Sequence, residues 1–87
     1  MLYMSSMNTI EKSKILKEVI IRVARKSLGQ NDITDETSLV KDLGFDSVQM
    51  VELIVEIESE FDIEIQDDDL DIEKLMIFKS LLDIVKA

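Results

Sequence analysis

Apolar positions along this chain recur with helical spacing in three stretches. The first spans residues 9–28, and its apolar stripe consists of Ile15, Leu16, Val19, Ile20 and Val23. Asn8 and Glu11 have the spacing of a capping box at its start. Leu28-Gly29 is a common helix stop, because glycine readily adopts the left-handed cap conformation. The pattern therefore predicts a helix over residues 9–28, with one face in the core.

The second stretch, Ser47 to Phe61, has two apolar faces. The wider one predicts the core contact and consists of Met50, Leu53, Ile54, Ile57 and Phe61. The polar side is expected to hold Gln49, Glu52, Glu56 and Glu60. Val48, Val51 and Val55 form a second patch on the side of Ser47. We expect Val48 and Val55 to be exposed for docking, whereas Val51 is either exposed or covered by the preceding loop.

The third periodic stretch runs from Ile77 to Val85, and the segments between the helices have other patterns. Residues 29–46 are rich in turn formers and hold four apolar residues spaced as anchors, namely Ile33, Leu39, Leu43 and Phe45. Phe61 to Ile65 alternates with period two, but no second strand is available, so we expect an extended link whose Ile63 and Ile65 enter the core.

Residues 67–71 read as the acidic first turn of a short helix with Leu70 turned inward. The fold class that follows is all-α, a small antiparallel bundle of three main helices plus one short helix. We expect a flexible tail over residues 1–8 and one domain over residues 9–87, which is a size that fits a single small core.

The composition removes several functional classes. The chain has no cysteine and no histidine, so it lacks disulfides, thiolate nucleophiles, imidazole bases and the usual zinc ligands. We expect no intrinsic catalysis and no catalytic residues, because the carboxylates fall on polar helix faces. No apolar run has the length of a membrane span, and the N-terminus lacks the features of a signal peptide. We therefore expect a cytoplasmic monomer.

Charge is distributed unevenly along the chain. Residues 1–45 hold 6 acids and 7 bases, whereas residues 46–87 hold 13 acids and 3 bases. Nucleic acid binding is not expected, because phosphate contacts require lysine and arginine. The acidic half instead favours a protein partner with a basic surface.

The acidic run Asp67-Asp68-Asp69 raises the question of calcium binding. An EF-hand loop needs glycine at its sixth position and glutamate at its twelfth. Counting from Asp67 gives Ile72 and Phe78, and counting from Asp62 gives Asp67 and Glu73, so neither register fits. We expect no metal site.

The start of the second helix carries the candidate chemistry. Gly44 permits an unusual turn, Asp46 is a good N-cap, and Gln49 completes a capping box. Ser47 then lies in the first helical turn, where an attached anion faces the positive end of the helix dipole.

The segment Leu43-Gly44-Phe45-Asp46-Ser47-Val48, followed by Val51-Glu52-Leu53 and the run from Ile57 to Ile65, resembles the acyl carrier protein family from about residue 10 to residue 85. The resemblance implies that Ser47 carries 4′-phosphopantetheine, received from coenzyme A through a phosphopantetheinyl transferase. It also implies that Asp46, next to Ser47, belongs to the cofactor-binding site. Acyl or aminoacyl groups are then carried as thioesters to partner enzymes of fatty acid, polyketide or related biosynthesis.

The same resemblance implies that acyl-activating, synthase or transferase enzymes meet this surface with basic patches. The residues expected to bind them are Val48, Glu52, Val55, Glu56 and Glu58. Val48 stands where the family commonly has leucine, and Gln49 where fatty-acid carriers often have an acid, which leaves the pathway open. Two alternatives remain, a non-catalytic acidic adaptor with the carrier fold but no prosthetic group, and an acidic calcium-responsive module.

Overall fold

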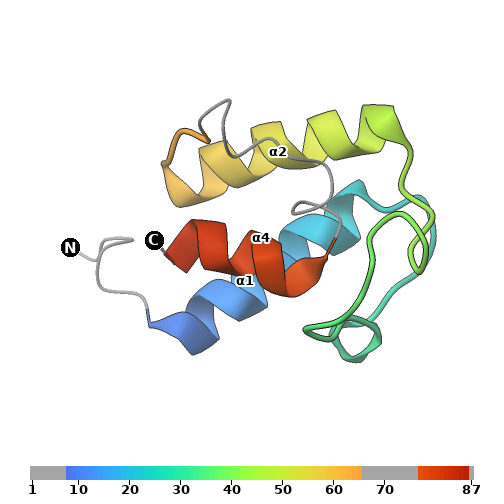
Figure 1. Cartoon of the computed structure of the whole chain (residues 1–87), viewed down its shortest axis with the longest axis horizontal. Coiled ribbons are helices and arrows are strands. Elements are labelled where there is room, and N and C mark those ends of the chain that lie inside the picture. Colours follow the sequence, from blue (N-terminus) through green and yellow to red (C-terminus); the bar gives the residue numbers. More distant parts are fainter. Residues whose placement is uncertain (1–7, 66–76, 87) are drawn as a thin grey trace.

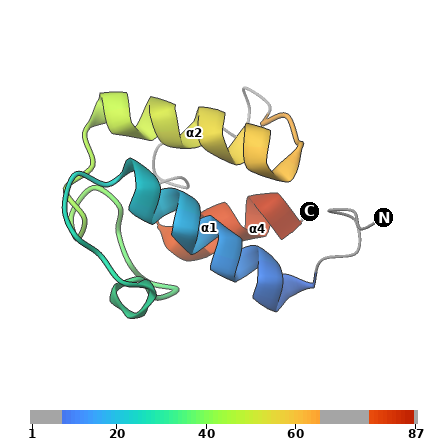
Figure 2. The same cartoon turned by 180° about the vertical axis from the view of Figure 1, so that it is seen from behind.

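The structure is a computed structural model that describes residues 8–65 and 77–86. It contains three α-helices, α1 (Thr9–Val23), α2 (Ser47–Phe61) and α4 (Phe78–Lys86), and a short 3-10 helix, η2 (Gln30–Asp32). In Figures 1 and 2, α1 runs opposite to both α2 and α4. The all-α class predicted from the sequence is confirmed. The expected N-terminal tail, apart from Asn8, and the short acidic helix lie outside the described residues.

The core lies between the three helices, and α1 packs against both others. Each helix contributes the apolar face that its periodicity predicts. The helical residues that are buried are Leu16, Val19, Ile20, Leu53, Ile57, Phe61, Phe78, Leu81, Leu82 and Val85. Met50 and Ile54, also expected in the core of α2, are half-buried against this cluster. The second helix is therefore fixed mainly by Leu53, Ile57 and Phe61.

The long loop between α1 and α2 is pinned to the bundle, as its anchor residues predict. Ile33, Leu39, Leu43 and Phe45 are all buried in the same core. The loop also accepts the first hydrogen bonds of α4: the backbone N–H of Phe78 donates to the carbonyl of Thr37 at 3.0 Å, and that of Lys79 to Asp35 at 3.0 Å. These bonds satisfy donors that have no partner inside the helix. The loop therefore joins the start of α4 to the start of α2.

The first helix is shorter than the sequence pattern predicts. It ends at Val23, and Ala24 is extended, so the expectation of a helix to Leu28 with a left-handed cap at Gly29 is wrong. Gly29 has φ −101° and begins η2 instead. The Gln49 Nε2 group donates to the carbonyl of Val23 at 3.3 Å, which caps α1 from outside. A tertiary contact that periodicity does not register therefore provides a partner for the last carbonyl of α1.

The link after α2 agrees with the prediction. Asp62 is left-handed (φ 53°), a conformation in which aspartate is tolerated, and the backbone N–H of Ile63 donates to the carbonyl of Glu58 at 3.1 Å. Ile65 is buried and Ile63 is half-buried against the core. Residues 63–65 thus belong to neither a helix nor a strand, and Ile63 and Ile65 enter the core as expected.

Candidate functional site

Ser47 is the first residue of α2, and a reciprocal capping box fixes its position. The backbone N–H of Gln49 donates to the Asp46 carboxylate at 2.8 Å, and the backbone N–H of Asp46 donates to Gln49 Oε1 at 3.1 Å. Ser47 itself is exposed, and within the described residues its hydroxyl has no hydrogen-bond partner. The cap therefore occupies its neighbours and leaves the serine oxygen accessible.

A tight turn delivers the chain to this cap. Gly44 has φ +73°, and its N–H donates to the carbonyl of Val40 at 3.1 Å, while that of Phe45 donates to Leu39 at 3.0 Å. Residues other than glycine adopt this left-handed backbone conformation only at a cost in free energy. Phe45 is buried immediately after the turn. Asp46 and Ser47 are thus presented at the surface by a glycine turn followed by a buried aromatic anchor.

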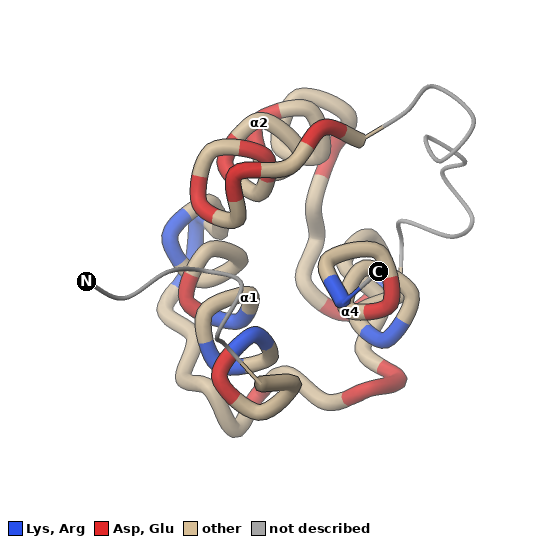
Figure 3. Tube along the Cα trace, turned by 90° about the vertical axis from the view of Figure 1, so that its left-hand side faces the viewer, with Lys and Arg blue, Asp and Glu red and all other residues tan. Residues whose placement is uncertain are grey.

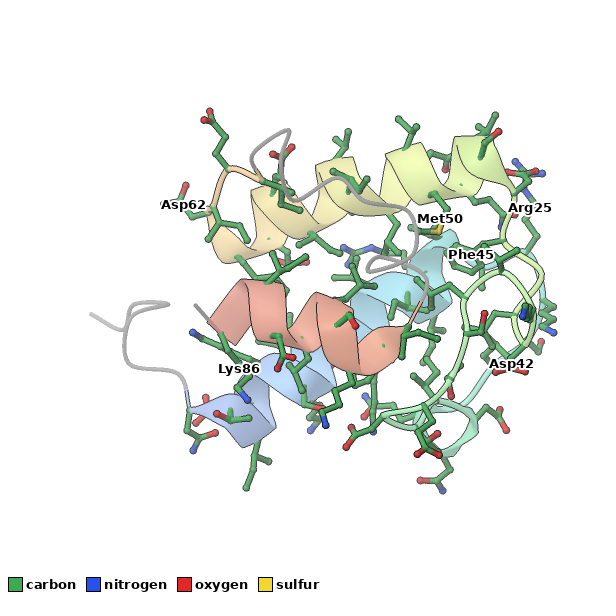
Figure 4. All side chains as sticks on the ribbon, viewed as in Figure 1. Arg25, Asp42, Phe45, Met50, Asp62 and Lys86 are labelled. Carbon is green, nitrogen blue, oxygen red and sulfur yellow. The ribbon has the colours of Figure 1, made fainter. Side chains whose placement is uncertain are left out.

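Two cations from the segment after α1 contact the loop and cap that lead into α2. Arg25 lies 3.5 Å from the Asp46 carboxylate, and Figure 4 shows it at this end of the molecule. Lys26 Nζ donates to the carbonyl of Asp42 at 3.3 Å. Both contacts tie the segment after α1 to the loop that leads into the serine. The sequence pattern does not predict this role for Arg25, because it predicts that the helix continues through that residue.

The exposed patch expected on α2 is present, and it includes all three valines. Val48 is 58%, Val51 61% and Val55 56% exposed, so the loop does not cover Val51. We call Val48, Val51 and Val55 the valine face. Beside it lies an open hollow of about 360 Å³ whose walls include Val23 and Glu52. Exposed apolar residues with polar neighbours are typical of a docking surface.

One expectation for the polar side of α2 is wrong. Gln49 is buried, with 4% exposure, because its amide spans from the cap at Asp46 to the end of α1. Its side chain has partners at both ends, so burial leaves no polar atom unsatisfied. The helical wheel places Gln49 opposite the core stripe and predicts that it faces solvent. The hydrogen bond to the carbonyl of Val23 explains why its side chain is buried instead.

Two glutamates of α2 form ion pairs with an arginine of α1. Arg22 Nη2 lies 3.0 Å from a carboxylate oxygen of Glu56 and 3.0 Å from one of Glu60. These hydrogen bonds, that of Glu60 foremost, raise the pKa of Arg22 above its usual value. Arg22 thus joins the polar edges of the two helices.

The acidic residues predicted to bind partners thus differ in their surroundings. Glu56 is paired with Arg22, and Glu58 accepts a hydrogen bond from the backbone N–H of Ile65 at 2.8 Å. Glu52 is exposed and has no ion pair within the described residues. Figure 3 shows that acidic residues predominate along α2, whereas lysines and arginines lie on α1 and α4.

Chemically, the site offers an accessible hydroxyl at a helix N-terminus and little else that is reactive. Over residues 8–65 and 77–86, the structure contains no group of three or more carboxylates placed to hold a metal ion. Within the same ranges, no helix is long and apolar enough to cross a membrane. The chain has no histidine and no cysteine, so no imidazole or thiol accompanies the Ser47 hydroxyl.

Two comparisons with known proteins agree on what this chain resembles. A family model described as a phosphopantetheine attachment site matches residues 14–85. The acyl carrier protein of Buchnera aphidicola subsp. Baizongia pistaciae (strain Bp) is 41% identical over 80 residues, which cover 92% of this chain and 95% of that protein. Both matches include the turn, the cap and the serine described above.

Proposed function

The chain belongs to the acyl carrier protein family, a family of carriers rather than catalysts, and from this premise we propose that Ser47 is the residue that bears 4′-phosphopantetheine. The chain has a phosphopantetheine attachment domain over residues 14–85. Ser47 is favoured as the attachment point because its exposed hydroxyl has no partner among the described residues and stands at a capped helix N-terminus.

The local geometry suits a phosphodiester on this oxygen. The first backbone N–H groups of α2 have no acceptor inside the helix, and the positive end of the helix dipole lies at the same place. Asp46 would hold the helix start in shape through Gln49 rather than contact the phosphate, since its carboxylate already accepts from the Gln49 N–H and pairs with Arg25. The bound group supplies the thiol that this cysteine-free chain lacks.

In the loading reaction, Ser47 Oγ is the nucleophile. A bond forms between Oγ and the β-phosphorus of coenzyme A, the pyrophosphate bond breaks, and adenosine 3′,5′-bisphosphate leaves. The serine proton passes to a base of the phosphopantetheinyl transferase, which also supplies magnesium. This division of roles is consistent with a chain that has no histidine or cysteine to act as a base.

The valine face and Glu52 would form the surface that partner enzymes meet. Three exposed valines give a small apolar contact beside Ser47, and Glu52 offers an unpaired charge to a basic patch. A contact of this size favours brief encounters, which suits a carrier that visits several enzymes. The cargo would be acyl or aminoacyl groups held as thioesters, for fatty acid, polyketide or related biosynthesis.

The test is the intact mass of the protein after incubation with coenzyme A, magnesium and a broad-specificity phosphopantetheinyl transferase. We expect the wild-type chain to gain one phosphopantetheinyl group and the Ser47→Ala variant to gain none. A Ser5→Ala variant is a matched control that should load like the wild type.

Absence of loading in a folded wild-type chain, with a transferase that modifies a known carrier in the same assay, would overturn the proposal. It would favour instead an adaptor with the carrier fold and no prosthetic group. Loading that persists in Ser47→Ala would place the attachment elsewhere.

A further inference from the structure

A second surface lies between α1 and α4, on the side of the bundle away from α2. It is a groove of about 530 Å³ that extends from the first turns of α1 to the loop around Gln30. In Figure 1 these two helices lie below α2, and Figure 3 marks basic residues on both of them. Ser47 and the valine face do not line this groove.

The lining is basic although the chain as a whole is acidic. Four lysines line it, Lys14, Lys17, Lys79 and Lys86, against two aspartates. The whole chain has a formal net charge of −9. Lysines that line one groove create a positive potential at that groove, even though the chain as a whole has a negative net charge.

Two of the four lysines have a partner within the fold, and two have none among the described residues. Lys17 Nζ lies 5.7 Å from the centre of the Phe78 ring, and Lys86 lies 3.8 Å from the Asp83 carboxylate. Lys14 and Lys79 are exposed, and neither side chain has an ion pair or hydrogen bond within the described residues. Their charges, one from each helix, are therefore available to a ligand that lies in the groove.

The groove also offers apolar contact. Ile10, on the first turn of α1, is 79% exposed, more than any residue of the valine face, and Leu82 contributes to the lining from α4. An occupant with both carboxylates and an aliphatic side chain would match lysines and isoleucine together. We call this surface the basic groove.

We propose that the basic groove binds an acidic peptide segment of a partner protein, with an aliphatic residue of that segment placed against Ile10 and Leu82. The concave shape favours a segment of chain over a flat lipid surface. Nucleic acid fits less well, because the described residues that line the groove include no aromatic side chain on which bases could stack. The carrier would be held by this groove while α2 remains free for enzymes.

The experiment is a titration of the full, isotope-labelled chain with the peptide acetyl-Glu-Glu-Leu-Glu-Glu-Leu-Glu-amide, followed by amide chemical shifts. We expect shifts confined to the first half of α1 and to α4, with affinity that falls as salt rises. The same peptide with glutamine in place of glutamate should produce none.

Matched variants connect the shifts with the lysines. Lys14→Glu and Lys79→Glu should each weaken binding, and the double variant by about tenfold or more. Lys41→Glu makes the same change in net charge at an exposed lysine outside the groove and should bind like the wild type. Loading of Ser47 by the transferase should be unchanged in all four variants, which separates this proposal from the one above.

Several results would overturn the inference. They are an absence of shifts at about 1 mM peptide, shifts centred on the start of α2, or equal loss of binding in Lys41→Glu. Binding to vesicles that contain phosphatidylglycerol, without binding of the peptide, would assign the groove to a lipid surface instead. Concentration-dependent dimerisation that Lys14→Glu abolishes, again without peptide binding, would assign it to a second copy of this chain.

Discussion

At the scale of single residues, Gln49 connects three parts of the molecule. Its backbone N–H and side-chain oxygen complete the cap with Asp46, and its side-chain nitrogen donates to the carbonyl of Val23. The residue thereby ends α1 and begins α2 at one point. Since Ser47 lies between the two partners of the cap, the presentation of the candidate attachment site depends on this buried amide.

Replacing this amide should therefore be costly. We expect Gln49→Ala to lower the free energy of unfolding by about 1–3 kcal/mol, because the backbone N–H of Asp46 and the carbonyl of Val23 lose their partner in a part-buried setting. Glu52→Ala, a change on the exposed side of the same helix, is the control and should cost less than about 0.5 kcal/mol. Chemical denaturation of both variants gives the comparison, and equal stability would contradict the role assigned to Gln49.

At the scale of elements, α2 has two apolar faces with opposite uses. Leu53, Ile57 and Phe61 are buried against α1 and α4, whereas the valine face is exposed along the helix. The buried face holds the helix in the bundle, whereas the exposed face contributes little to the stability of the fold. The polar edge between them carries Glu56 and Glu60, which pair with Arg22 of α1.

The two faces should respond differently to the same loss of side chain. Leu53→Ala should destabilise the protein by about 2–5 kcal/mol, because it leaves a cavity in the core. Val51→Ala, two residues away and 61% exposed, should change stability by less than about 0.5 kcal/mol. Thermal or chemical unfolding measures both. A similar loss in the two variants would mean that the valine face is covered by another part of the chain.

At the scale of the whole molecule, charge divides the surface into two regions. Acidic residues predominate along α2 (Figure 3). The basic groove lies between α1 and α4. Each region would attract a different class of protein partner. With this arrangement, the chain would bind an acidic peptide through the basic groove while enzymes act on Ser47 from the side of α2.

This division predicts which acid matters for the enzymes that meet α2. Glu52→Lys should slow loading by the transferase several-fold, mainly through a lower association rate that depends on salt, since Glu52 is the glutamate of the predicted docking set without an internal partner in the described residues. Glu18→Lys, an equal change of charge on exposed α1, is the control. Rates from mass spectrometry over time decide the matter. Equal slowing in both variants would indicate a general charge effect rather than a docking contact.

Much of this protein follows from the sequence alone. Helical periodicity, the cap at Asp46 and the anchors of the long loop predict the bundle, the exposed position of Ser47 and the exposure of Val48 and Val55, because each depends on residues close together in the chain. The exposure of Val51 was left open by the sequence. The extended link with buried Ile65 follows from the same local reasoning.

The remaining features depended on contacts between residues far apart in sequence. Three such features link α1 to α2 across a loop of more than twenty residues. The hydrogen bond between Gln49 and Val23 accompanies the end of α1 and the burial of Gln49. The ion pairs are those of Arg22 with Glu56 and of Arg25 with Asp46. A periodic pattern records which face of a helix is apolar, but it holds no information on which polar group of another helix will stand opposite. Only the tertiary structure brings these groups together, and it alone reveals the basic groove, which neither α1 nor α4 forms by itself.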